Sequence, residues 1–265
     1  MKKRKKVGLV LGSGGARGIA HVGVLKVLER EGIKIDYLVG CSMGSFIGAC
    51  YALGFCLSDL EKEFKDFEKK RKVIKGLVDF SMKNSILKGE KVYKHIFRLV
   101  KNYTFKDLKI PFKIMVTDLE NGDEVALSDG DLVKAIQASV SVPGIFPPVE
   151  INGRYFIDGG VTNPTPIDVA DSMGADLIIG VDFVSQRKKK YVSNPKMMTT
   201  LSRTFDIVRF QVLKFKMEKI ADKTILIKPK IRSSIDSFKF YNIKKFIQSG
   251  EEATEKVLDQ IKKEI

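Results

Sequence analysis

Apolar residues follow two patterns along this chain: short unbroken runs, and longer stretches in which they recur every three or four positions. The runs are typical of strands covered on both faces of a sheet, and the periodic stretches of amphipathic helices. Strands are predicted at residues 7–11, 112–118, 124–127, 156–158, 176–182 and 224–227, and in the apolar run that ends at Cys41. Helices are predicted from a glycine-rich loop to Gly32, from Ser42 to Gly54, and at 59–75, 91–100, 131–139, 166–174, 200–221 and 242–265, the last interrupted at Gly250. This alternation predicts an α/β fold, a three-layer α/β/α sandwich with a mostly parallel central sheet.

One domain, residues 1–265, is expected to hold these elements, because the chain shows no internal repeat and is long enough to bury a substantial core. Its core covers about residues 7–182, and a basic loop, a helix, a strand and a closing helix in 183–265 complete it. Residues 184–198 are predicted to form a mobile loop. Residues 76–110 are expected to cap one end of the sheet, and whether 59–110 form a lid stays open.

Turn-forming residues separate the predicted elements in the second half of the chain. Asn121-Gly122 and the segment 151–155 predict hairpins, since Asn and Gly tolerate the positive φ of tight turns. The prolines of 142–149 exclude a helix and predict an ordered loop.

On the helix predicted at 200–221, the pattern places apolar residues on one side and basic residues largely off that side. The apolar side comprises Leu201, Phe205, Val208 and Val212, and the basic residues are Arg203, Arg209, Lys214 and Lys216.

The chain is strongly basic, with 47 Lys and Arg against 32 Asp and Glu and a net charge of +15. Such a charge favours an anionic partner, although much of it is spread over solvated helix surfaces and also serves solubility. Only residues 1–6 and 187–190 are dense basic runs. Neither run is interleaved with stacking aromatics or accompanied by a nucleic-acid motif, so a nucleic-acid partner is not expected.

Cysteine usage and hydropathy bear on the compartment. Cys41, Cys50 and Cys56 are odd in number and lack partners at metal-ligand spacing, which predicts buried, reduced thiols in a reducing compartment. The apolar run after the basic residues 1–6 is too short for a signal peptide, and the weakly polar window 37–57 is better explained as a buried strand and helix than as a membrane span. A cytoplasmic protein is therefore expected.

The segment Gly40-Cys41-Ser42-Met43-Gly44 has the spacing Gly-x-Ser-x-Gly at a strand-to-helix junction. Gly40 and Gly44 would let the chain turn sharply and let the helix approach the strand without a Cβ clash. The turn would present the Ser42 hydroxyl at a helix N-terminus, whose partial positive charge favours a developing alkoxide. This pattern indicates a nucleophile, but a plain turn explains it equally well until partners are found.

A second glycine-rich segment, residues 12–18, follows the first strand and opens a helix. Its backbone N–H groups could face an anion, either a cofactor phosphate or the oxyanion of an acyl-transfer intermediate. Asp36, about 20 residues further on, would suit a dinucleotide site. The glycines do not fit G-x-G-x-x-G in either frame, so the nucleotide hypothesis is disfavoured.

A base for Ser42 must be found among few candidates. The chain has only two histidines, His21 and His95, and neither lies at a strand end; a packed or capping role is favoured for His21. No histidine follows Asp158, so the usual triad order cannot be completed. Asp158 ends a predicted strand before two glycines and is the natural base. A free aspartate has a pKa of about 3.9, so it would need desolvation and a well-formed oxyanion hole.

Taken in order, Gly14-Gly15-Ala16-Arg17-Gly18, Gly40-x-Ser42-x-Gly44 and Asp158-Gly159-Gly160 resemble the patatin-like phospholipases, and the run from Ser139 to Val149 is similar to that of compact bacterial members. The resemblance is strong over residues 7–182. It implies a Ser42–Asp158 dyad without histidine, with backbone amides of the loop formed by Gly14, Gly15, Ala16 and Arg17 as the oxyanion hole. Arg17 would hold that loop or meet a lipid phosphate. Many members have a third consecutive glycine where this chain has Ser13.

The activity that this resemblance implies is hydrolysis of lipid acyl esters, of phospholipase A, lysophospholipase or esterase type. No cofactor or metal is expected, because no acidic or histidine cluster suits catalytic calcium. Lysines would support peripheral contact with an anionic membrane at its inner face. A non-catalytic lipid- or acyl-binding regulator on the same fold stays open, as does acyl transfer to an alcohol in place of water.

Overall fold

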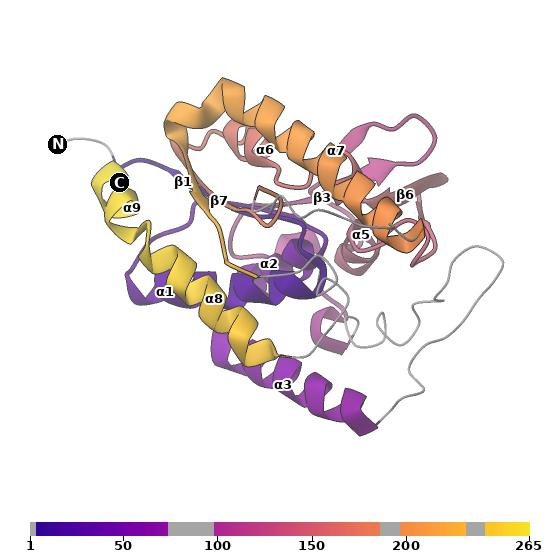
Figure 1. The fold of residues 1–265 in the computed structure, drawn as a ribbon, viewed down its shortest axis with the longest axis horizontal. Coiled ribbons are helices and arrows are strands. Elements are labelled where there is room, and N and C mark those ends of the chain that lie inside the picture. The colour runs from indigo at the N-terminus through magenta and orange to yellow at the C-terminus, as the bar shows by residue number, and fades with distance from the viewer. Residues whose placement is uncertain (1–3, 74–97, 186–196, 232–241) are drawn as a thin grey trace.

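A computed structural model of the chain describes residues 4–73, 98–185, 197–231 and 242–265 (Figure 1). These residues form an eight-stranded sheet in which neighbours in the series β5-β6-β3-β2-β1-β7-β8 are hydrogen-bonded, with β4 paired to β3. Strands β1, β2, β3, β7 and β8 are mutually parallel, whereas β4 and β6 run antiparallel to β3. The strands are β1 (Val7–Leu11), β2 (Tyr37–Cys41), β3 (Phe112–Asp118), β4 (Glu124–Leu127), β5 (Val149–Ile151), β6 (Arg154–Asp158), β7 (Leu177–Val181) and β8 (Thr224–Ile227).

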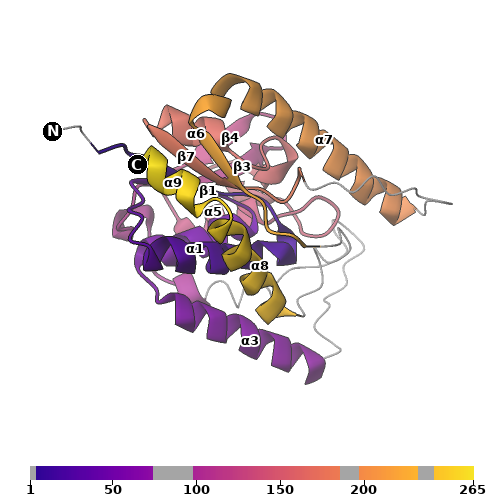
Figure 2. The ribbon, with the colours of Figure 1, turned by 60° about the vertical axis from the view of Figure 1, so that its left-hand side comes forward.

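Helices cover both faces of this sheet, which confirms the predicted three-layer sandwich with a mostly parallel centre (Figure 2). Side chains alternate along β1 between the two layers: Leu9 and Leu11 join one buried cluster and Val10 joins the other. The larger cluster packs beneath α1 (Ala20–Arg30), α2 (Met43–Leu53), α3 (Leu57–Val73), α5 (Leu132–Ser139), α8 (Ile243–Glu255) and α9 (Leu258–Glu264). The smaller packs beneath α6 (Ile167–Ser172) and α7 (Met197–Ile220).

Local turn chemistry behaves as the sequence predicts. Asn121-Gly122 joins β3 to β4, and Asn152 and Gly153, with φ of 52° and 78°, join β5 to β6. The segment 142–148 is irregular, as the prolines require. Short 3₁₀ helices lie at η1 (Gly15–Ile19), η2 (Phe105–Asp107), η3 (Gly159–Val161) and η4 (Ala221–Lys223). Most of the helix predicted at 91–100, the basic run 187–190 and His95 lie outside the described residues.

The predicted interruption at Gly250 is wrong, because α8 runs through this residue and ends only at Glu255. A Cβ on Gly250 would lie 2.0 Å from the carbonyl oxygen of Ala20, and one on Gly23 would lie 2.0 Å from that of Ile247. Each glycine therefore lets the backbone of α1 approach the backbone of α8. Gly250 therefore allows the two helices to contact each other and does not mark the end of a helix.

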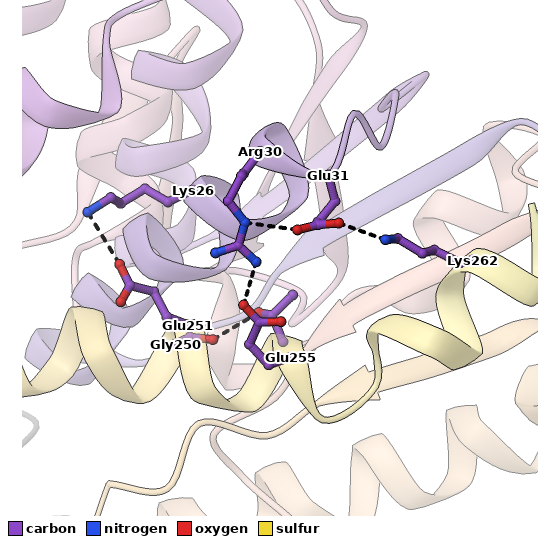
Figure 3. A network of polar contacts seen from close by, with 8 residues as sticks. Lys26, Arg30, Glu31, Gly250, Glu251, Glu255 and Lys262 are labelled. Atoms are coloured by element: carbon purple, nitrogen blue, oxygen red, sulfur yellow. Dashed lines mark hydrogen bonds and ion pairs between the residues drawn. The ribbon is translucent and has the colours of Figure 1, made fainter.

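Charged side chains flank this glycine contact (Figure 3). Lys26 pairs with Glu251 at 3.3 Å, Arg30 pairs with Glu255, and Lys262 of α9 pairs with Glu31 at 2.7 Å. The last two pairs join the C-terminal end of α1 to α8 and to α9. Exposed ion pairs contribute about 0–1 kcal/mol each, so close backbone packing is the main cause of the contact.

Two predictions about buried side chains also need correction. Cys56 is exposed, although Cys41 and Cys50 are buried and all three thiols are free. On α7 the apolar stripe is displaced: Val208 faces solvent, whereas Leu213 and Ile220 are buried against α6 and the sheet. Among the described helices, none is both long enough and apolar enough to cross a bilayer.

Candidate active site

Strands β2 and β6 lie end to end along one edge of β3, and this arrangement brings Ser42 and Asp158 together. Met115 of β3 pairs with β2 and also with β4, so β2 and β4 occupy opposite edges of β3. Val116 pairs with β4 and also with Asp158 of β6, so β6 occupies the edge that β2 leaves free beyond Cys41. Because β6 is antiparallel to β2, their carboxyl ends meet. Asp158 ends a strand that follows a hairpin, as the sequence predicts, and this strand is antiparallel to β2.

Ser42 stands at the turn between β2 and α2 with φ of 56° and ψ of −123°. This backbone conformation is strained for a residue with a side chain and is typical of functional turns. A Cβ on Gly40 would lie 2.6 Å from Cα of Ser45, and one on Gly44 would lie 1.9 Å from the carbonyl oxygen of Leu11. Neighbouring backbone atoms lie too close to Gly40 and Gly44 for either residue to carry a side chain. Larger residues at these positions would therefore distort the turn.

The last residue of α5 and the segment that follows it hold the backbones of both Ser42 and Asp158. The N–H of Ser42 donates to Oγ of Ser139 at 2.9 Å, and the N–H of Asp158 donates to the carbonyl of Ser141 at 3.0 Å. Ser139 is fully buried. One short stretch of chain therefore sets the separation of the candidate nucleophile and the candidate base. Sequence analysis noted Ser139 only as part of a resemblance.

The carboxyl of Asp158 is completely buried, and burial raises its pKa. Three interactions oppose this rise and favour the carboxylate: the positive charge of Arg209, a hydrogen bond from the Ser42 side chain, and the N–H of Gly160, which donates to Oδ1 at 2.6 Å. Oδ2 has no partner of good hydrogen-bonding geometry among the described residues. Oδ2 is therefore the oxygen of this carboxyl that is left free to accept a proton.

Arg209 of α7 is the residue of this site that sequence analysis missed. Its Nε donates to the carbonyl of Gly160 at 2.8 Å, so Gly160 is held by Asp158 through its N–H and by Arg209 through its carbonyl. Arg209 lies four residues from both Phe205 and Leu213, on the side of the helix that packs inward. A charged residue at helical spacing between apolar ones was the available signal.

The glycine-rich loop that follows β1 is anchored to β7 and to the segment before α6. The N–H of Gly12 donates to the carbonyl of Val181 at 3.3 Å, and the N–H of Ser13 donates to that of Pro164 at 2.7 Å. Gly15 has φ of 55°, where glycine is favoured, and begins the 3₁₀ turn that leads into α1. The loop therefore lies at the carboxyl end of β1, next to the turn that carries Asp158: a Cβ on Gly160 would lie 2.7 Å from Oγ of Ser13.

Two further side chains support this loop. Nε2 of His21 lies 2.8 Å from the carbonyl of Gly12, so this nitrogen carries the hydrogen, and burial lowers the pKa of His21 to about 4. The imidazole is neutral at pH 7 and packs edge-on against Phe183, which supports the predicted packed role. Nε of Arg17 donates to the carbonyl of Gly14 at 3.4 Å, and its guanidinium lies 6.0 Å from the ring centroid of Phe183.

Cys41 is the other nucleophile near Asp158. Its Sγ lies 4.0 Å from Oδ1, and burial, followed by the negative charge of Asp158, raises the pKa of the thiol well above its usual value. Cys41 therefore remains a protonated thiol, and Ser42 is the better candidate nucleophile. Among the described residues, no three His, Cys, Asp or Glu side chains gather in a way that could hold a metal ion.

This sheet topology and this site define an α/β protein with a serine on a strained strand-to-helix turn and a buried aspartate beside it. The chain belongs to the patatin-like phospholipase family, whose model matches residues 9–171.

Named relatives are similar to this chain over about two thirds of its length. It is 35% identical over 184 residues to human patatin-like phospholipase domain-containing protein 6, covering 68% of this chain and 13% of that protein. It is 37% identical over 181 residues to an uncharacterized NTE family protein of Mycobacterium tuberculosis, covering 67% and 49%. It is 33% identical over 181 residues to lysophospholipase NTE1 of Kluyveromyces lactis, covering 68% and 13%. The chain therefore matches less than half of each of these relatives.

Solved structures with low identity share the fold. VipD from Legionella pneumophila superposes with a TM-score of 0.55 at 14% identity, over 97% of this chain and 67% of that one. The type III effector protein ExoU superposes with a TM-score of 0.50 at 13% identity, over 98% and 53%.

Proposed function

We propose that this chain is a serine acyl-ester hydrolase that acts on lipid esters, with Ser42 as nucleophile and Asp158 as general base. The observation that carries the proposal is the meeting of β2 and β6, which places a fully buried carboxylate beside the hydroxyl of a strained serine. Membership of the patatin-like phospholipase family and the name of the relative lysophospholipase NTE1 support a lipid ester as substrate.

In the first half of the reaction, Asp158 accepts the proton of Ser42 Oγ while Oγ attacks the ester carbonyl. Burial raises the proton affinity of Asp158, which makes it a stronger base than an aspartate in water. As the tetrahedral intermediate collapses, the bond to the alcohol breaks and the leaving oxygen takes the proton from Asp158. An acyl-Ser42 ester and a free alcohol, such as a lysophospholipid, result.

In the second half, Asp158 accepts a proton from water as the water attacks the acyl-Ser42 carbonyl. The bond to Oγ then breaks, and Oγ recovers the proton, releasing a fatty acid. An alcohol in place of water would give acyl transfer, so product analysis with added glycerol separates hydrolysis from transfer.

The negative charge that develops on the carbonyl oxygen needs hydrogen-bond donors. We assign this role to backbone N–H groups of the loop Gly14, Gly15, Ala16 and Arg17. Gly15 and Ala16 are the first residues of the 3₁₀ turn that continues into α1, and first-turn amides have no partner inside a helix. Anchoring of the loop by His21 and Arg17 holds these donors in place before substrate binds.

The test is hydrolysis of a short-chain p-nitrophenyl ester and of a fluorescent phospholipid by the purified protein. Ser42→Ala and Asp158→Asn are each expected to lower kcat by at least about 10³-fold, the scale found when a nucleophile or its base is removed. Ser172→Ala and Asp171→Asn remove the same groups outside the site and are expected to keep full activity. Circular dichroism confirms that each variant is folded.

Activity that survives either site substitution in a folded protein would refute the dyad. If the wild type cleaves neither ester but binds the lipid, the chain is a lipid-binding regulator instead. If the wild type is active, its relative turnover of a diacyl phospholipid and of a lysophospholipid assigns the hydrolase subtype.

The free thiols favour a reducing, cytoplasmic location, and the excess of lysine favours peripheral contact with the inner membrane face.

A further inference from the structure

The outward face of α7 exposes large apolar side chains on two turns, at Ile207 and Val208 and again at Phe215 about two turns further on. Ile207, Val208 and Phe215 are 45%, 47% and 58% exposed, whereas Leu213 on the opposite face is 3% exposed. Figures 1 and 2 both show α7 on the outside of the molecule, on the opposite face of the sheet from α1 and α8. Single exposed apolar residues are ordinary, but three on one face of one helix indicate an interaction surface.

Lysines flank this apolar face. At 100° per residue, Lys214 projects to one side of Phe215 and Lys219 to the other, and both are exposed. Nζ of Lys219 lies 4.6 Å from the centroid of the Phe215 ring. On the exposed side of α7, Lys214 and Lys219 stand against one exposed acidic residue, Glu218, and the whole chain has a net charge of +15. An anionic surface with an apolar interior complements this arrangement, whereas an apolar protein groove would leave the lysines without partners.

The same helix reaches the candidate active site. Ile207 and Val208 directly precede Arg209, whose Nε contacts the carbonyl of Gly160 at 2.8 Å. The outward face and the Asp158-Gly159-Gly160 turn are therefore separated by about the thickness of one helix, about 10–12 Å. A surface held against α7 would lie beside the site.

We propose that the outward face of α7, formed by Ile207, Val208, Phe215, Lys214 and Lys219, docks this protein on an anionic phospholipid surface. The choice of a lipid surface rests on the proposed function. Phe215 and the two aliphatic side chains insert at the level of the headgroups, and the lysine stems lie along them with their ammonium groups among the phosphates. Docking holds the lipid surface within about one helix thickness of the site.

Flotation with vesicles of phosphatidylcholine, alone or mixed with phosphatidylglycerol, measures this binding. The wild type is expected to bind the mixed vesicles more tightly and to lose binding as salt rises. Lys214→Gln and Lys219→Gln are each expected to weaken binding about fivefold, the equivalent of about 1 kcal/mol per lysine near an anionic surface. Phe215→Ser is expected to weaken it about tenfold.

Hydrolysis of a water-soluble short-chain ester separates docking from chemistry. These variants are expected to keep wild-type turnover of the soluble ester and to lose turnover of phospholipid in vesicles. Ile265→Ser changes an exposed apolar residue outside α7 and is the matched control, expected to bind and turn over vesicles normally.

The proposal would be overturned if the wild-type protein failed to bind anionic vesicles, or if the Phe215→Ser variant bound them as well as the wild type. So would a loss of dimer by size-exclusion chromatography in Phe215→Ser, since it would assign the face to a second copy of the chain. Vesicle binding that depends on α7 without hydrolysis of either ester would leave docking standing and refute the proposed hydrolase.

Discussion

Arg209 is expected to support the activity of Asp158 from outside the reacting pair, and its replacement by methionine tests this. The substitution removes a charge-assisted hydrogen bond to the carbonyl of Gly160 and a positive charge near a buried carboxyl. Hydrogen bonds from charged groups have a net worth of about 1.5–3 kcal/mol. If this energy serves to hold the Asp158 turn in its reactive geometry, kcat falls about 10- to 150-fold.

The pH dependence gives the sign of the electrostatic effect. Burial raises the pKa of Asp158, and the charge of Arg209 lowers it. Removing that charge lets the pKa rise further. Because the proposed base must be ionised to accept the proton of Ser42, the acid limb of the activity profile is expected to move to higher pH in Arg209→Met. Arg209→Lys keeps the charge and is expected to show a smaller shift with a similar loss of geometry.

The assay is kcat/KM for the water-soluble ester across pH, with folding checked by circular dichroism. Lys214→Met is the matched control, because it removes one positive charge from the exposed face of the same helix. Its profile is expected to overlay the wild type. A profile of Arg209→Met that also overlays the wild type, or an acid limb that moves to lower pH, would refute the reasoning.

Three further predictions follow from buried contacts. Ser139→Ala leaves the N–H of Ser42 without its acceptor and is expected to lower the free energy of unfolding by about 1–3 kcal/mol and to reduce ester turnover, measured by urea titration and kinetics. Gly250→Ala forces a methyl group against the carbonyl of Ala20 and is expected to lower the free energy of unfolding by about 1–3 kcal/mol in urea, despite a gain in helix propensity. Asp158→Asn is expected to gain thermal stability relative to wild type as pH rises from about 4, because a raised folded-state pKa makes the ionised carboxyl destabilising above the unfolded value of about 3.9.

Matched controls exist for these variants. Ser141→Ala leaves in place the backbone carbonyl that Asp158 uses, and Gln248→Ala changes an exposed residue of the same helix as Gly250. Ser139→Ala with wild-type stability and turnover would show that the Ser42 N–H finds another acceptor. Gly250→Ala without destabilisation would mean that α1 and α8 separate at no cost. A wild type that gains stability over Asp158→Asn with rising pH would contradict the burial argument.

The sequence by itself determined the features whose physical cause is local. Unbroken apolar runs identified the strands buried on both faces, and Asn-Gly pairs identified the hairpin turns, because only a few residues tolerate a positive φ. The spacing Gly40-x-Ser42-x-Gly44 identified the sharp turn, since close backbone contact at both glycines excludes larger residues. The lack of a suitable histidine and the position of Asp158 at a strand end before two glycines indicated it as the base of Ser42, and the family resemblance implied the same pair.

Only the tertiary structure decided how distant segments meet. That β6 is antiparallel and continues the edge of β3 where β2 stops depends on strand register, which no local pattern encodes. Arg209 reaches Gly160 because α7 packs with a rotation that its mixed pattern of apolar and basic residues left ambiguous. Gly250 resembles a helix end in sequence, and only the partner helix α1 shows that its missing side chain makes room for another backbone. In each case the deciding interaction joins residues far apart in the chain.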